Sequence, residues 1–153
     1  MREGRAPNRS SPAKIDAMLD AYLIPEKTTV TAKGDGPALD VGALESRVLL
    51  LQLTVTGAVE QEAIDVSVWG GADENTLGKL PLASFPQAFY GGEYTLLLDL
   101  TALPETRVLR VHWEVRRWGR GPELPWFEFS VRATEVSAEL LGQRERNNQS
   151  LKL

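Results

Sequence analysis

The sequence predicts an all-β protein: an antiparallel β-sandwich, jelly-roll-like, with a short N-terminal helix and extended terminal arms. Apolar and polar residues alternate with a period of two in five separate segments of the chain. Turn-rich connections separate these segments, and no helix-length amphipathic segment stands between them, which argues against a parallel sheet. Strands with one apolar and one polar face are typical of two antiparallel sheets packed face to face.

Polar segments at both ends divide the chain into three parts. Residues 1–27 are expected to form an N-terminal arm, residues 28–138 the sandwich domain, and residues 139–153 a C-terminal arm. Residues 1–11 and the C-terminal arm contain too few apolar side chains to bury the area that ordering requires.

The N-terminal arm is expected to hold one short helix. Ser11 can cap this helix, Pro12 suits its first position, and Pro25 would end it. The apolar side chains between them follow the i, i+3, i+4, i+7 spacing of one helical face: Ile15, Met18, Leu19 and Tyr22. A helix this short is marginal in isolation, so this face must pack on the sandwich or on a neighbouring chain.

From Thr28 onward the apolar pattern predicts seven or eight strands. Beyond residues 28–33 and a turn at 34–37, alternation marks the segments 47–56, 64–68, 94–101, 109–116 and 127–134. A shift of one residue would expose the apolar face of any strand. The expected core consists of Leu49, Leu51, Leu53, Val55, Ile64, Val66, Val68, Leu96, Leu98, Leu109, Val111, Trp113, Val115, Phe127, Phe129 and Val131.

Composition excludes several classes of function. The chain has 153 residues and no cysteine, so disulfides and thiolate metal sites are excluded. Its net charge of −4 disfavours nucleic-acid binding through phosphate contacts. No run of about 18 apolar residues is present, so no membrane span is expected. The arginines near the N-terminus precede no apolar stretch, so we expect no secretory signal and a cytoplasmic location by default.

No residue pattern predicts a catalytic, cofactor or metal site. The single histidine, His112, falls on the polar face of a strand beside Arg110 and Glu114, as on any solvated sheet face. Residues 73–75 lack the spacing of a calcium loop. A carboxylate pair of the glycosidase kind could be built from distant residues, but nothing singles one out. We therefore expect no enzymatic activity.

The tryptophans of one connection are the candidate binding residues. Trp118 and Trp126 bracket the loop 119–125, and Arg120 lies within it. Exposed tryptophans can stack on sugar rings, and tryptophan with arginine also marks protein interfaces. A third interpretation is that one of them closes the end of the core. The sequence leaves these alternatives open.

Six segments together carry a resemblance to a known group of proteins. They read TTVT at 28–31, GDGPALDVG at 34–42, IDVSVWG at 64–70, LPLASFP at 80–86, RVLRVHW at 107–113 and WFEFSV at 126–131. Over residues 28–135 this order resembles small β-sandwich structural proteins encoded among the head and tail genes of tailed bacteriophages and prophages. The chain departs from them in the turn at 71–75 and in the long loop 119–125.

The resemblance implies a non-enzymatic structural subunit of a virion, such as a capsid decoration or head/tail-associated protein. Such a subunit would be a homo-oligomer whose arms bind neighbouring capsid or tail proteins, with no cofactor and no metal. We expect the contacts to involve Ile15, Met18, Leu19, Tyr22, Trp118, Arg120 and Trp126. The alternative is a carbohydrate-binding module that uses exposed tryptophan and tyrosine, including Tyr90.

Overall fold

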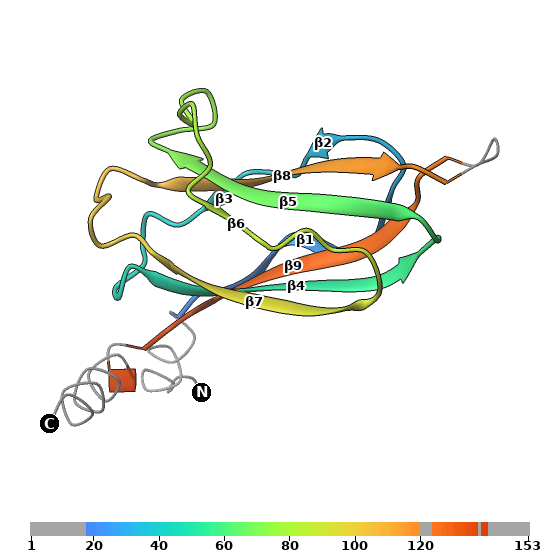
Figure 1. The fold of residues 1–153 in the computed structure, drawn as a ribbon. Coiled ribbons are helices and arrows are strands. Elements are labelled where there is room, and N and C mark those ends of the chain that lie inside the picture. The colour runs from blue at the N-terminus through green and yellow to red at the C-terminus, as the bar shows by residue number, and fades with distance from the viewer. Residues whose placement is uncertain (1–17, 120–123, 138, 141–153) are drawn as a thin grey trace, which may run out of the picture.

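Two antiparallel sheets face each other in a β-sandwich-like arrangement (Figure 1). The structure is a computed structural model that describes residues 18–119, 124–137 and 139–140. All nine elements assigned in these ranges are strands, and three of them are only two residues long. The predicted all-β class with two antiparallel sheets is therefore confirmed.

The first sheet has four strands in the order β1 (Asp20–Val30), β9 (Phe127–Glu135), β4 (Val48–Ala58) and β7 (Gly92–Asp99). The second has β8 (Val108–Arg117) near its centre. On one side β8 pairs with β2 (Gly34–Asp35) and β3 (Leu39–Asp40), and on the other with β5 (Glu62–Gly71), which pairs with β6 (Ala83–Ser84). Along the chain, the strands pass back and forth between the two sheets.

The core lies between the sheets, where the period-two pattern places it. Thirteen of the sixteen residues expected in the core are buried, and the other three, Leu96, Trp113 and Val115, are partly buried against it. The indole of Trp113 on β8 meets the ring of Phe129 on β9 edge to face, with ring centroids 5.7 Å apart. Aromatic contacts of this kind add about 1 kcal/mol to the area they bury, and this one joins the two sheets directly.

The helix expected before Pro25 is wrong for residues 20–24, because they lie in β1. A short helix has little stability of its own, whereas β1 pairs with β9 from Asp20 to Val30. The helical spacing rested on Ile15, Met18, Leu19 and Tyr22, and of these only Tyr22 lies in β1. Met18 and Leu19 are not helical either, and the earlier residues of that helix, up to residue 17, lie outside the described ranges. The sheet thus begins at Asp20, within the segment expected to be an arm.

Pro25 interrupts β1 without ending it. β1 is an edge strand, so a residue without an N–H group costs little where the strand leaves its partner. The register with β9 shifts between Ile24 and Thr28, and Lys27 takes a positive φ of 65°. The hydroxyl of Thr28 donates to the carbonyl of Pro25 at 2.7 Å and closes this bulge. The bulge pushes residues 25–27 out of the ladder.

A buried carboxylate fastens one end of the sandwich. Glu62, at the start of β5, is 1% exposed. It accepts hydrogen bonds from the backbone N–H groups of Val59 and Trp126, each at 2.8 Å. Trp126 precedes β9, so Glu62 joins the second sheet to the entry of a central strand of the first. Buried groups of this kind are costly to leave unpaired.

A second buried carboxylate fastens the other end of β9. Glu135 accepts hydrogen bonds from the backbone N–H groups of Leu19, Glu45 and Ser46 at 2.9–3.2 Å. Leu19 precedes β1, and residues 45–46 lead into β4. One side chain therefore sets where three strands of the same sheet begin or end.

The role of Glu62 can be measured with a conservative variant. In Glu62→Gln, an amide nitrogen replaces one of the two carboxylate oxygens that accept backbone N–H bonds, so one buried N–H group loses its acceptor. We therefore expect the free energy of unfolding to fall by about 1–3 kcal/mol. The matched control is Glu60→Gln, an exposed residue two positions away, which should change it by less than about 0.5 kcal/mol. Urea denaturation of both variants makes the comparison. Equal effects of the two substitutions would contradict the role given to Glu62.

Candidate functional site

The structure separates the seven residues expected to bind a partner. Ile15 and Arg120 lie outside the described residues. Met18 is exposed just before β1, whereas the neighbouring Leu19 packs against the core. Tyr22 lies within β1 on the outer face of the four-stranded sheet. The apolar stripe expected across these positions is therefore not formed by the described members.

The two tryptophans of the β8–β9 connection have different surroundings. Trp118 is exposed, whereas Trp126 is partly buried and lies against Gly57 of β4. A Cβ atom added at Gly57 would come within 2.7 Å of the Trp126 ring, so only glycine leaves room for the indole there. Trp126 thus packs against β4 near one end of the first sheet, and the interpretation that one tryptophan closes the end of the core stays a prediction.

Trp118 belongs to a group of exposed aromatic side chains at the same end of the sandwich. We call Phe89, Tyr90 and Trp118 the aromatic cluster. The rings of Phe89 and Trp118 meet edge to face, with centroids 6.0 Å apart and an interplanar angle of 71°. The side chains of Phe89, Tyr90 and Trp118 are 40%, 71% and 57% exposed. The N–H group of Trp118 donates to the carbonyl of Gln61 at 3.0 Å, which ties the cluster to the β4–β5 turn.

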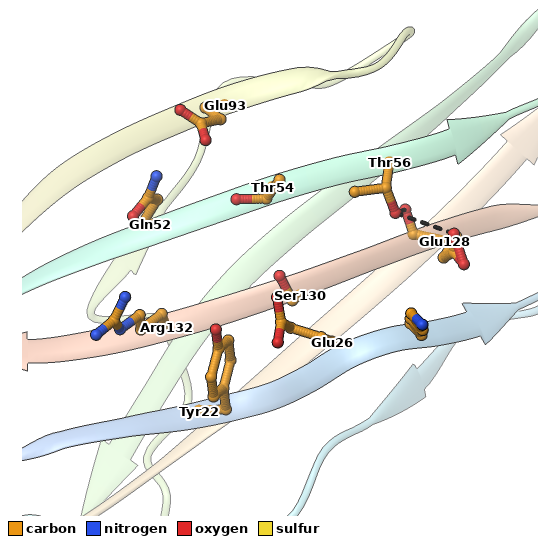
Figure 2. A pocket seen from close by; sticks show the side chains of 10 residues that line it. Tyr22, Glu26, Gln52, Thr54, Thr56, Glu93, Glu128, Ser130 and Arg132 are labelled. Atoms are coloured by element: carbon orange, nitrogen blue, oxygen red, sulfur yellow. Dashed lines mark hydrogen bonds between the residues drawn. The ribbon is translucent and has the colours of Figure 1, made fainter.

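A polar groove crosses the outer face of the four-stranded sheet (Figure 2). It has a volume of about 380 Å³ and takes side chains from β1, β4, β7 and β9. Its lining consists of Tyr22, Glu26, Lys27, Gln52, Thr54, Thr56, Glu93, Glu128, Ser130 and Arg132. Of these residues, only Tyr22 was expected from the sequence to bind a partner.

Strand register explains how these residues meet. Thr54 of β4 lies opposite both Glu93 of β7 and Ser130 of β9. One row further along, Gln52 lies opposite Arg132, which in turn lies opposite Tyr22 of β1. Since alternate residues of a strand face the same side, three neighbouring strands present a continuous polar surface. Polar alternation was visible in the sequence, but the register that brings these rows together was not.

The charged groups of the groove are partly paired. The Arg132 guanidinium donates to both carboxylate oxygens of Asp20, at 2.8 and 2.6 Å, and these bonds hold the pKa of Asp20 below its ordinary value. Thr56 donates its hydroxyl hydrogen to Glu128 at 3.1 Å, the bond drawn in Figure 2. The groove also contains the carboxylates of Glu26 and Glu93.

The outer face of the second sheet carries His112, whose two ring nitrogens are both engaged. Nδ1 lies 2.9 Å from the Asp35 carboxylate and Nε2 lies 3.1 Å from that of Glu114. Burial of the ring opposes protonation, but the hydrogen bonds to Glu114 and Asp35 outweigh it and raise the pKa of His112. Neither nitrogen is left to take a proton from a hydroxyl nucleophile, which a catalytic histidine requires. Its visible role is to join β2 to β8.

Within the described ranges, no group of three or more histidine, cysteine, aspartate and glutamate side chains is arranged to hold a metal ion. A helix long and apolar enough to cross a membrane is likewise absent from those residues. No protein-family model matches the chain, and no curated protein sequence does either. The resemblance over residues 28–135 therefore stays a prediction.

The pairing of His112 gives stability a defined pH dependence. A pKa that is raised in the folded state means that protonated His112 stabilises the fold. This contribution to the free energy of unfolding is fully present below the unfolded pKa of 6.5 and is lost as the pH rises through the folded pKa. We therefore expect wild type to exceed His112→Gln in stability by more at about pH 6 than at about pH 9, with a difference below about 1 kcal/mol because the site is partly exposed.

Proton NMR can test this directly, because the chain has a single histidine. The ring resonance of His112 should titrate above 6.5, and Glu114→Gln should lower its midpoint. An Asp65→Asn variant serves as a control, since Asp65 bonds Gln87 and Arg116 and not His112. A midpoint at or below 6.5 in wild type would contradict the assignment.

Proposed function

We propose that the protein is a non-enzymatic structural subunit that associates with other copies of itself through the aromatic cluster. The observation that carries the proposal is the group of three exposed aromatic side chains at one end of the sandwich, two of them in ring contact. Interfaces are enriched in large aromatic residues, and a monomer gains nothing by leaving such rings in water. Truncation of residues of this kind often costs an interface at least 2 kcal/mol.

The order of the strands supports a jelly roll as the finer fold. With β2 and β3 counted as one interrupted strand, the two sheets read β1-β9-β4-β7 and β2/β3-β8-β5-β6. First and last strands are neighbours, and the chain passes from one sheet to the other after every strand except β5, which is followed by β6 of the same sheet. Two intertwined Greek keys produce this order, and viral capsid domains are among the proteins built in this way.

A virion is the assembly that the sequence favours. The segments between residues 28 and 135 resemble phage head and tail proteins, and a jelly roll suits a particle subunit. On this proposal the protein is a capsid decoration or head/tail-associated protein located in the virion, and its partners are capsid or tail proteins. The engaged ring nitrogens of His112 support a role without catalysis.

The geometry does not favour sugar binding by the residues first considered for it. A sugar-binding platform presents a flat aromatic face, but the Trp118 ring meets Phe89 at 71°, and Trp126 lies against Gly57. Trp118 and its neighbours therefore fit a protein interface better.

Light scattering of the full chain tests self-association. We expect wild type to form an oligomer at about 100 μM and Trp118→Ala to shift it toward the monomer, with association weakened about 30-fold. Phe89→Ala should act in the same direction, because it removes the ring that holds Trp118. Circular dichroism confirms that the variants remain folded.

Leu80→Ala is the matched control. Leu80 is also a large exposed apolar residue, but it lies in the β5–β6 connection, near the opposite end of β5. It should leave the mass unchanged. A monomeric wild type, or an oligomer that Trp118→Ala does not affect, would overturn the proposed interface.

The N-terminal arm can be tested separately. Its truncation has to stop before Asp20, because a longer deletion removes part of β1. Deletion of residues 1–17 is expected to lower the average mass in light scattering while the thermal unfolding of the sandwich is preserved. An unchanged mass would leave the aromatic cluster as the sole basis of association.

A further inference from the structure

The polar groove of the four-stranded sheet has the shape of a binding site. Its centre is formed by the short side chains of Thr54 and Ser130. Longer side chains surround them, with Gln52 on β4, Glu93 on β7 and Tyr22 on β1. Figure 2 shows this arrangement, with the short residues in the middle strands and longer side chains around them. The volume of about 380 Å³ falls in the range of small-molecule sites.

The groove also has hydrogen-bonding capacity that the protein does not use. The side chains of Gln52, Thr54, Glu93 and Ser130 make no hydrogen bond to any other described residue. A hydroxyl offers a donor and an acceptor, an amide offers both, and a carboxylate accepts only. Their combination suits a ligand whose groups both donate and accept at closely spaced positions.

On the opposite sheet, several polar side chains bond one another. There Trp69 donates its indole N–H to Ser67 at 3.0 Å, and His112 is held by two carboxylates. The Nε atom of Arg110 on that face is buried without a hydrogen-bond partner among the described residues.

The charged side chains of the groove indicate which class of ligand it can bind. Three glutamates line the groove, Glu26, Glu93 and Glu128, against two cations, of which Arg132 is already paired with Asp20. With Asp20 included, four carboxylates stand against the two cations Lys27 and Arg132, so the groove is net negative. Phosphate, sulfate and uronate groups would therefore be repelled, whereas neutral hydroxyl groups can donate to the carboxylates.

Tyr22 adds an aromatic surface to one edge of the groove. Its side chain is 39% exposed and lies beside Arg132. The bulge at residues 25–27, with its positive-φ Lys27, continues the same edge. Bulges of this kind recur beside functional sites, where they redirect side chains. Four neighbouring strands span about 14 Å, so an extended ligand can cross the groove.

We propose that this groove binds a neutral oligosaccharide. The hydroxyls of the sugar bond Gln52, Thr54, Ser130 and Glu93, and one sugar ring packs on Tyr22. This function is separate from self-association, because the aromatic cluster belongs to the connections at one end of the sandwich and the groove to the face of a sheet.

Calorimetric titration of the full chain with four neutral probes tests the site: cellohexaose, xylohexaose, mannohexaose and maltohexaose. At least one should bind saturably, with a Kd between about 10 μM and 1 mM, and polygalacturonate should not bind. Gln52→Ala and Thr54→Val should each weaken binding about five- to tenfold. Amide NMR shifts on titration should be largest at residues 52, 54 and 130.

Thr95→Val is the control for Thr54→Val. Thr95 lies on the adjacent strand and faces the same side, opposite Gln52, but it does not line the groove. Its substitution should leave the affinity unchanged. The proposal is overturned if none of the four probes binds, or if binding is lost in Trp69→Ala but not in Gln52→Ala. New reducing ends in the titrated samples would instead overturn the non-enzymatic role and leave the groove as a sugar site.

Discussion

The antiparallel pairing of β1 with β9 joins the first strand of the described fold to the last. Its partners, from Asp20 with Thr134 to Val30 with Phe127, are about 100 residues apart in the chain. This ladder holds β1 in the first sheet, supplies one wall of the polar groove and positions the residues that Glu135 binds. Contacts of such long range are lost together, because each requires that the intervening chain be folded. The groove therefore exists only when the whole sandwich has formed.

The sequence could predict the strands whose two faces differ. Apolar and polar residues alternate over nine residues or more in β4, β5, β8 and β9. The side chains that face the core in these strands are the predicted ones. β2, β3 and β6 have two residues each and carry no periodic signal. Residues 20–24 of β1 were mistaken for the end of a helix because Ile15, Met18, Leu19 and Tyr22 follow helical spacing and Pro25 suits a helix end. The strand character of β1 depends on β9, which no local pattern reveals.

The candidate binding residues could likewise be predicted from the sequence only in part. Trp118 and Trp126 look equivalent in the sequence, and only the approach of Gly57 to one of them separates a packed indole from an exposed one. The residues of the groove were visible as polar positions, but such positions occur on every solvated strand. What makes them a candidate site is the register that aligns Glu93, Thr54 and Ser130, together with the absence of hydrogen-bond partners for their side chains among the described residues. The register and the hydrogen-bond partners both depend on how neighbouring strands pair, which the sequence of a single strand does not show.

The bulge in β1 also affects how the first sheet meets other chains. An edge strand exposes unpaired N–H and C=O groups, and a second chain can extend the sheet by pairing with them. Pro25 removes one donor, and the positive φ of Lys27 turns the backbone away from a straight ladder. The opposite edge, β7, keeps an unbroken register with β4 over eight residues. Sheet extension into fibres is thus blocked on one side by backbone geometry, and β7 is where protection against aggregation has to come from side chains such as Glu93 and Asp99.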